Sequence, residues 1–208
     1  MNEPKVPRAE LFRELANIKI NDIKEFEDLI RQGIINERKR IDEYKCNLIN
    51  EQFESDYIDA LNDDRLQLLE IEDTCKLLII VKLRIIVEAI TKRLLLWTFN
   101  STSNEERNIF LRELSKHKNV LETLKKINII PEATAEFTVI DELRCLCNAI
   151  KHGVIVDNEL SGFPIWSSDK GKEIDANKID LRRFYDSIPK YVYELSEKVK
   201  QYLLSIRP

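Results

Sequence analysis

Apolar residues recur every three or four positions over most of the chain, and this spacing is typical of helices that bury one face. From residue 34 to residue 61 the recurring apolar residues are Ile34, Ile41, Tyr44, Leu48, Phe53, Tyr57, Ile58 and Leu61. A second segment, 64–98, carries apolar side chains on nearly all sides between Leu77 and Leu96, so we expect other helices to surround it. Asn62-Asp63-Asp64 between the two segments suits a helix cap. The pattern therefore predicts a long antiparallel helix pair, 34–61 and 64–98, at the centre of the fold.

Shorter helices are predicted on both sides of this pair. Residues 8–32 predict one or two short amphipathic helices, with Gly33 as a stop. The residues from Ser103 to Glu106 form a capping-box pattern, in which the serine and glutamate side chains satisfy each other's free backbone N–H groups. A helix to about residue 116 should follow, and then a short helix over 120–127.

The C-terminal part predicts two further helices separated by a long loop. The first helix begins near Pro131 and ends at His152, where a following glycine favours a stop. Residues 153–178 contain three of the four glycines and suit a long loop, with a small hairpin near its start. The last helix has apolar residues at helical spacing from Ile188 onward, with Pro189 in its first turn.

These elements define an all-α fold, a helical bundle around the long αα-hairpin with a long loop or small hairpin before the C-terminal helices. The 208 residues include only four glycines and six prolines, while 34% are charged and 43% hydrophobic, which favours long helices over a fold with many turns. We expect N-terminal short helices over 1–33 and a single main domain over 34–208.

Charge and cysteine content narrow the class of protein. A formal net charge of −4 is not that of a general nucleic-acid binder, although a local basic patch remains open. Four scattered cysteines do not suggest a secreted disulfide framework. The N-terminus lacks the apolar core of a signal peptide, and the most apolar stretch, 77–97, contains five charged residues, too many for a membrane span. We therefore expect a cytoplasmic protein without a membrane segment.

The helix that ends at His152 carries its polar residues on one face. On a helical wheel with Arg144 at the origin, Asn148 lies at about 40°, Lys151 at about −20°, Asp141 at about 60° and His152 at about 80°. The opposite side holds the apolar residues Ile140, Leu143, Leu146, Cys147, Ile150 and Val154. Five polar side chains therefore line one side of a single helix.

Those residue types suit the chemistry of phosphodiester bonds. Histidine moves protons near neutral pH, and arginine or lysine stabilises the charge that develops on a phosphate. RNA supplies its own nucleophile, the 2′-hydroxyl, so this chemistry needs no metal and no cofactor. A plain structural interpretation also stays open, because Lys151 and His152 before Gly153 are what a solvated helix end favours.

The run Arg144-x-x-x-Asn148-Ala-Ile-Lys151-His152-Gly153 resembles the motif of the HEPN superfamily. The resemblance implies a bundle of about four or five helices, commonly a homodimer. It also implies a metal-independent endoribonuclease of toxin–antitoxin, abortive-infection or CRISPR-linked defence systems. In active members, histidine and arginine from two subunits promote attack of the 2′-hydroxyl on the adjacent phosphate and leave a cyclic phosphate end.

The run departs from the family motif at its arginine. In the usual pattern four to six residues separate an arginine from the histidine, and a polar residue such as asparagine often follows the arginine directly. Here Cys147 stands directly before Asn148, and Arg144 lies one turn earlier. An arginine side chain can span the roughly 4.5 Å of helix axis between these positions. Lys151 can also supply the positive charge, without the bidentate reach of a guanidinium.

Three charged residues, Arg84, Glu88 and Lys92, lie four positions apart on the otherwise apolar segment 64–98. They predict either an internal ladder of ion pairs or a stripe that faces Arg144 and His152, with Glu88 orienting them. Elsewhere, His117 is expected to be a solvated linker residue. Cys145 and Cys147 point to different sides of one helix and cannot share a metal ion, so no metal site is expected.

The leading hypothesis is a HEPN-like protein of a prokaryotic defence or toxin–antitoxin system that cleaves RNA. The expected catalytic residues are Arg144, Asn148, Lys151 and His152, supported by Glu88, Arg84 and Asp141. RNA, a second copy of the chain, and an antitoxin or effector protein are the expected partners. The alternatives are a catalytically inert helical module that binds a protein or nucleic acid, and a small-molecule sensor with the long loop as a lid.

Overall fold

The computed structural model describes residues 8–50, 55–99 and 103–206. Within these ranges the chain forms α-helices and short 3-10 turns, with no β-strand and one isolated bridge between Ile155 and Glu173. The α-helices are α1 (Ala9–Asn50), α2 (Ser55–Leu96), α3 (Asn104–Glu113), α4 (His117–Lys126), α5 (Phe137–Lys151) and α6 (Leu181–Ser205). The all-α prediction is confirmed. None of the described helices has a stretch long and apolar enough to cross a membrane.

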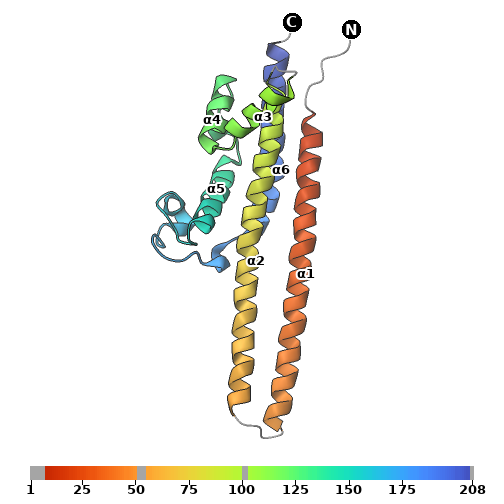
Figure 1. The fold of residues 1–208 in the computed structure, drawn as a ribbon, viewed down its shortest axis with the longest axis vertical. Helices are drawn as coiled ribbons and strands as arrows, with labels where there is room; N and C mark the ends of the chain where they lie inside the picture. Colours follow the sequence, from red (N-terminus) through yellow and green to blue (C-terminus); the bar gives the residue numbers. More distant parts are fainter. Residues whose placement is uncertain (1–7, 51–54, 100–102, 207–208) are drawn as a thin grey trace.

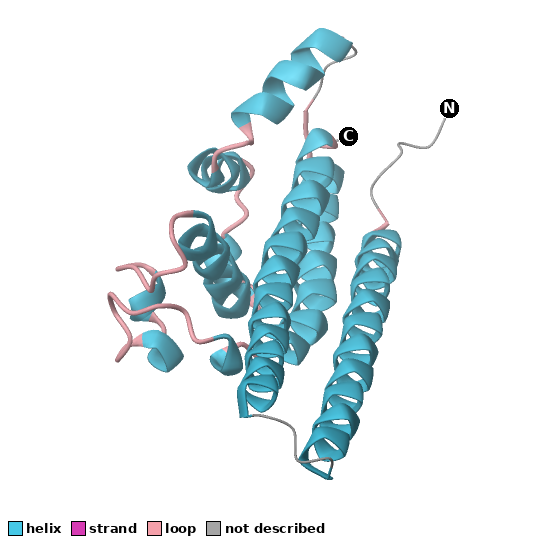
Figure 2. Ribbon diagram, turned by 60° about the horizontal axis from the view of Figure 1, so that its bottom comes forward, coloured by secondary structure: helices cyan, strands magenta, loops and turns pink. Residues whose placement is uncertain are grey.

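The helices pack around a long antiparallel pair. α1 and α2 lie side by side, and α6 packs against both of them (Figure 1). α5 contacts α2 and α6, while α3 and α4 lie near the end of α2, close to the C-terminus of the chain (Figures 1 and 2). The other ends of α1 and α2 extend beyond α6 as a two-helix arm.

A buried apolar seam holds α1 against its neighbours. The buried residues of this seam include four that are separated by seven or fourteen positions: Ile20, Ile34, Ile41 and Leu48. A spacing of seven keeps such a seam on one side of a helix over many turns. Polar contacts across the pair set its register, since Arg38 Nη2 lies 3.0 Å from Glu72 Oε2 and Lys45 Nζ donates to Asn62 Oδ1 at 2.8 Å.

The predicted ends of this helix pair were wrong. α1 continues through Gly33, so the expected short helices over 1–33 are its first half and the boundary between 33 and 34 falls inside one helix. Burial of Ile34 on the seam outweighs the cost of about 1 kcal/mol for a glycine in a helix. Asn62-Asp63-Asp64, the expected cap, lies inside α2. Phe53, assigned to the first helix, lies outside the described residues.

The C-terminal helix starts earlier than predicted. α6 begins at Leu181, after the carboxylate of Asp180 accepts a hydrogen bond from the backbone N–H of Arg183 at 3.3 Å. Pro189 therefore lies inside the helix and not in its first turn. Leu181 and Phe184 are buried and extend the apolar face toward the N-terminus, which stabilises the helix despite the hydrogen bond that proline cannot donate.

The long segment between α5 and α6 is packed into the core. Trp166 is fully buried, and its Nε1 donates to Glu142 Oε1 of α5 at 3.1 Å. The other oxygen of this buried carboxylate lies 2.6 Å from Arg183 Nη2 of α6. These contacts fix the segment to both helices. The expected small hairpin is reduced to the single Ile155–Glu173 bridge, and Gly153, with φ of 128°, follows α5 as predicted.

Candidate functional site

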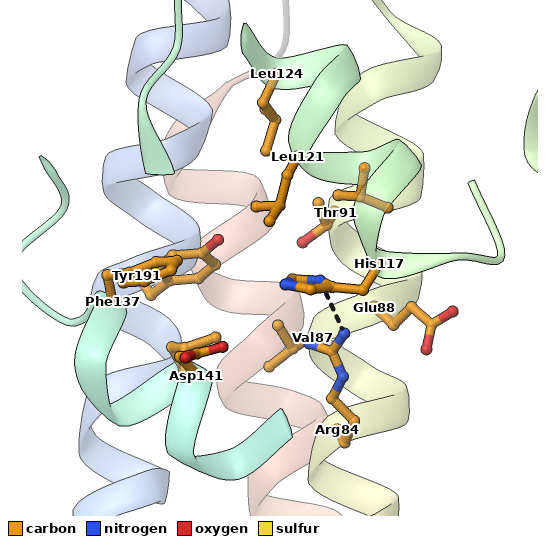
Figure 3. A pocket seen from close by; sticks show the side chains of 12 residues that line it. Arg84, Val87, Glu88, Thr91, His117, Leu121, Leu124, Phe137, Asp141 and Tyr191 are labelled. Carbon is orange, nitrogen blue, oxygen red and sulfur yellow. Dashed lines mark hydrogen bonds between the residues drawn. The ribbon is translucent and has the colours of Figure 1, made fainter. Parts of the chain in front are cut away.

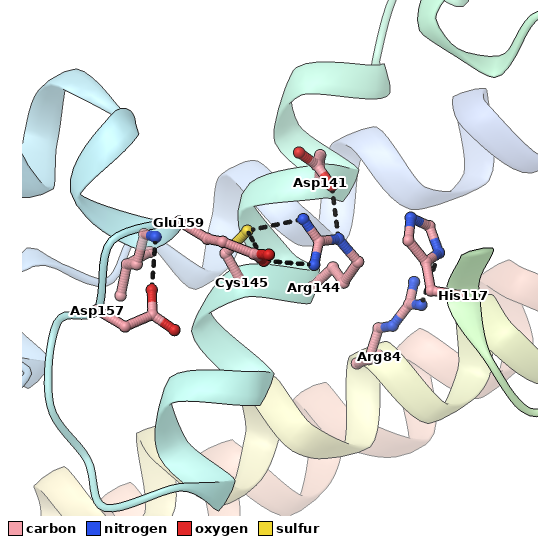
Figure 4. A network of polar contacts seen from close by, with 8 residues as sticks. Arg84, His117, Asp141, Arg144, Cys145, Asp157 and Glu159 are labelled. Atoms are coloured by element: carbon pink, nitrogen blue, oxygen red, sulfur yellow. Dashed lines mark hydrogen bonds and ion pairs between the residues drawn. The ribbon is translucent and has the colours of Figure 1, made fainter. Parts of the chain in front are cut away.

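Three helices bring a cluster of charged side chains and one histidine together. Arg84 comes from α2, His117 from the first residue of α4, and Asp141 and Arg144 from α5 (Figure 4). Arg84 Nη2 lies 3.5 Å from His117 Nδ1, a long contact in which only the guanidinium can donate. The charges of Arg84, Arg144 and Asp141 all act on the imidazole. The cluster therefore combines two cations, a carboxylate and a group that can carry a proton.

His117 is half-buried and was wrongly expected to be a solvated linker residue. Burial lowers its pKa to about 4, and the charges of Arg84 and Arg144 act in the same direction. The imidazole is therefore neutral at pH 7. The sequence did contain a signal for this position, namely the spacing of three and seven residues between His117 and the apolar Val120 and Leu124. On a helix this spacing places all three side chains on one face, and Val120 and Leu124 are buried.

Arg84 lacks a carboxylate partner among the described residues, although it is half-buried. Its neighbour one turn along α2, Glu88, pairs with Lys92, whose Nζ lies 2.7 Å from Glu88 Oε1. Burial lowers the pKa of Arg84, and the charge of Glu88 only partly opposes this effect. The expected ion-pair ladder is thus present only between Glu88 and Lys92. A guanidinium held without a direct counter-ion favours the approach of an anion.

Arg144, in contrast, has all of its nitrogens engaged by its own chain (Figure 4). Nε lies 2.7 Å from Asp141 Oδ1, Nη1 lies 2.8 Å from Glu159 Oε2, and Nη2 lies 3.1 Å from Cys145 Sγ. Burial alone lowers the pKa of Arg144, but the hydrogen bonds to the two carboxylates outweigh it and raise that pKa. Burial raises the pKa of Cys145 to about 12, so its thiol stays protonated.

A small cavity lies beside the cluster, between α2, α4, α5 and α6 (Figure 3). Its charged or titratable lining comes from Arg84, Glu88, His117 and Asp141, Thr91 and Tyr191 add hydroxyl groups, and the remaining walls are apolar. The volume of about 20 Å³ has room for about one water molecule. In this conformation the cavity therefore admits a water molecule but no nucleotide.

The other three residues of the predicted site lie farther along α5. Asn148 is half-buried, while Lys151 and His152 are exposed at the end of the helix. His152 follows Arg144 by eight positions, which corresponds to about 12 Å along the axis. The fold thus brings Arg84, Asp141 and Arg144 together as expected, but their histidine is His117. Glu159, which sequence reasoning also missed, reaches Arg144 from the segment after α5.

Comparison with models of protein families, with curated proteins and with solved structures finds no match to this chain. Among the described residues, no group of three or more histidine, cysteine, aspartate or glutamate side chains is placed to hold a metal ion. What the arrangement itself offers is the Arg84 guanidinium, without an ion pair within the described ranges, beside a neutral imidazole that can accept a proton, with a second guanidinium nearby that two carboxylates hold.

Proposed function

We propose that this protein is a HEPN-like, metal-independent endoribonuclease of a prokaryotic defence or toxin–antitoxin system. The observation that supports this function best is the half-buried Arg84, which has no carboxylate within ion-pair distance among the described residues and lies against the neutral His117. A cation without a counter-ion, beside a proton acceptor and a second guanidinium, suits a phosphodiester group. The motif resemblance on α5 adds RNA as the class of substrate.

In this mechanism His117 accepts the proton of the RNA 2′-hydroxyl as that oxygen attacks the adjacent phosphorus. The bond between the 2′-oxygen and phosphorus forms, the bond from phosphorus to the 5′-oxygen breaks, and the leaving oxygen takes a proton from the imidazolium or from water. Arg84 and Arg144 stabilise the charge on the phosphoryl oxygens. The phosphate also offsets the guanidinium charges that lower the pKa of His117, so the imidazole becomes a stronger base when substrate is bound.

The exposed end of α5 gives the RNA a path beyond the reacting bond. Asn148, Lys151 and His152 continue the polar face of the helix away from Arg144. Lys151 suits a contact to a neighbouring phosphate, and Asn148 suits a sugar hydroxyl. In this assignment His152 contacts RNA and does not carry the proton.

The test compares the two histidines on RNA cleavage by the purified protein in the presence of a chelator. We expect wild-type protein to leave cyclic phosphate ends, and His117→Ala or Arg84→Ala to lower kcat by about 100-fold or more. His152→Ala separates the two histidines and should raise KM more than it lowers kcat, because His152 is assigned an RNA contact and not the proton transfer. Circular dichroism shows whether each variant keeps its helices. An inactive wild-type protein, or a fully active and folded His117→Ala, contradicts the proposal.

A second candidate function is a module that self-associates through α2, and an exposed apolar stripe favours it. Ile71, Leu78 and Ile85 are seven residues apart on α2 and are 49%, 58% and 49% exposed. In an antiparallel pairing of two copies centred on Leu78, Ile71 meets Ile85, and Asp64 meets Lys92. In this pairing apolar side chains meet apolar side chains, and an acidic residue meets a basic one. It favours a homodimer of another kind than the one that the motif resemblance implies, in which residues of two subunits share one site.

A further inference from the structure

The guanidinium of Arg144 is held by two carboxylates that differ in how firmly they are fixed. Asp141 lies one turn earlier on α5, its side chain is 26% exposed, and it bonds Nε of Arg144. Glu159 comes from the segment after α5, its side chain is 61% exposed, and it bonds Nη1. Asp141 can therefore orient Arg144 permanently, while Glu159 lies where solvent and ligands reach the guanidinium.

The backbone under Glu159 is anchored, although its side chain is exposed. Leu160, the next residue, is fully buried, and its N–H donates to Asp157 Oδ1 at 2.8 Å. Glu159 can therefore leave Arg144 by rotation of its own side chain, with no movement of the segment. An exposed ion pair of this kind contributes only about 0–1 kcal/mol. Release of the carboxylate is therefore easy compared with the gain from a phosphate–guanidinium contact.

The small cavity beside the cluster offers no alternative place for the phosphate. Its space of about 20 Å³ beside His117 and Arg84 has no room for a phosphoryl group. Of the two carboxylates that hold an anionic oxygen against Arg144, Glu159 is the more exposed, and its charge acts on His117 as well as on Arg144. A phosphoryl group that took the position of this carboxylate would therefore contact the guanidinium of Arg144.

We propose that the carboxylate of Glu159 occupies the position of a substrate phosphoryl group on Arg144, and that this group displaces it on binding. The inference rests on the proposed function, because it assigns the phosphate of that substrate to Arg144. Carboxylate and phosphate oxygens accept the same hydrogen bonds from a guanidinium, so one replaces the other on Nη1. Asp141 stays on Nε and keeps the guanidinium of Arg144 in place.

Displacement also explains how the charges of the cluster balance. In the free protein the positive charges of Arg84 and Arg144 are matched in number by the carboxylates of Asp141 and Glu159, both of which pair with Arg144. When Glu159 turns away, the cluster has one positive charge in excess, which the incoming phosphoryl group neutralises. Glu159 is therefore a positioning and specificity residue. An anion can compete with it for Nη1 of Arg144, whereas a neutral ligand cannot replace the charge that its release removes.

The experiment uses inorganic phosphate as the probe and the two histidines as reporters. Imidazole resonances are followed by NMR during phosphate titrations of wild-type protein, Glu159→Gln and Glu43→Gln. Glu43 is the matched control, because it is a similarly exposed glutamate, 66% exposed, paired with Lys39 at 3.7 Å on α1. We expect Glu159→Gln to bind phosphate about three- to tenfold more tightly than wild type, and Glu43→Gln to bind like wild type.

Phosphate should shift the resonances of His117 and raise its pKa above about 4, while those of His152 stay unchanged. Equal affinities in the two variants, a shift confined to His152, or no phosphate binding at all would overturn the inference. In RNA cleavage, Glu159→Gln should lower KM more than it changes kcat. Phosphate binding is measured without RNA, so it can be found in a protein that does not cleave RNA, and it can be absent from one that does. The ribonuclease proposal and this inference can therefore fail separately.

Discussion

Arg84 and Arg144 carry the same charge in one cluster, yet their surroundings shift their pKa values in opposite directions. Burial lowers the pKa of Arg84, whose one polar side-chain contact among the described residues is the His117 ring at 3.5 Å. Hydrogen bonds that Arg144 donates to Asp141 and Glu159 outweigh burial and raise its pKa. The opposite signs arise because Arg144 has two carboxylates at hydrogen-bond distance, while Arg84 has none among the described residues. It makes Arg84 the cation with the most to gain from a bound anion.

His117 should make stability depend on pH at the residue scale. Its pKa is about 4 in the folded chain, compared with 6.5 for a free histidine. Because the unfolded chain binds the proton more readily, the folded state loses stability as the pH falls from about 6.5 to about 4. After allowance for the half-exposed ring, we expect a loss of about 1–2 kcal/mol.

Chemical denaturation of wild-type protein and His117→Gln at several pH values measures this effect. The free energy of unfolding should fall more for wild type than for the variant between pH 6.5 and pH 4, since glutamine does not titrate. The other titratable groups are the same in both proteins, so their contributions cancel when the two free energies of unfolding are subtracted. Parallel curves for the two proteins over this range would show that the imidazole titrates normally.

At the scale of elements, helix positions were well predicted and helix ends were not. Gly33 and Pro189 were assigned to a helix end and a helix start, but both lie inside long helices, α1 and α6. Each residue costs a helix a limited amount of free energy, and the buried faces on both sides supply more. Local preference therefore identified where a helix is weakest, while packing decided whether it ends there.

Gly33, inside α1, and Gly153, just after α5, offer a direct test at this scale. A Cβ added at Gly33 would meet nothing within 4 Å, so Gly33→Ala should stabilise the protein by about 0.5–1 kcal/mol. Gly153 also has open space, but its φ of 128° is one that alanine rarely adopts. Gly153→Ala should therefore destabilise by about 1 kcal/mol or more. Thermal and denaturant unfolding of both variants checks the opposite signs, and a destabilised Gly33→Ala would contradict the first.

At the scale of the whole molecule, α2 carries two surfaces to which we assign different proposed roles. One side of the helix carries Arg84 toward α4 and α5, and the half-exposed stripe of Ile71, Leu78 and Ile85 lies about a third of a turn away. If two copies associate through this stripe, each keeps its own cluster of Arg84 and His117. A dimer of this kind differs from the composite site that the HEPN resemblance implies.

Sedimentation of wild-type protein and Leu78→Glu tests this surface. We expect wild type to form a dimer, and the variant to be largely monomeric because two glutamates would meet at the centre of the pairing. Leu29→Glu is the control, since Leu29 is 73% exposed on α1, outside the stripe. A monomeric wild type, or a Leu78→Glu dimer as stable as wild type, would leave α2 without a role in self-association.

The sequence by itself determined which segments are helical and which polar residues share the face of α5. Periodicity encodes these features, because residues on one helix are placed by fixed geometry, so the contact between Arg144 and Asp141 could be expected from their spacing alone. Tertiary structure alone decided that His117 and not His152 joins Arg84 and Arg144, and that Glu159 reaches the same guanidinium. These residues come from segments separated by turns, and where such segments meet depends on how their buried faces pack.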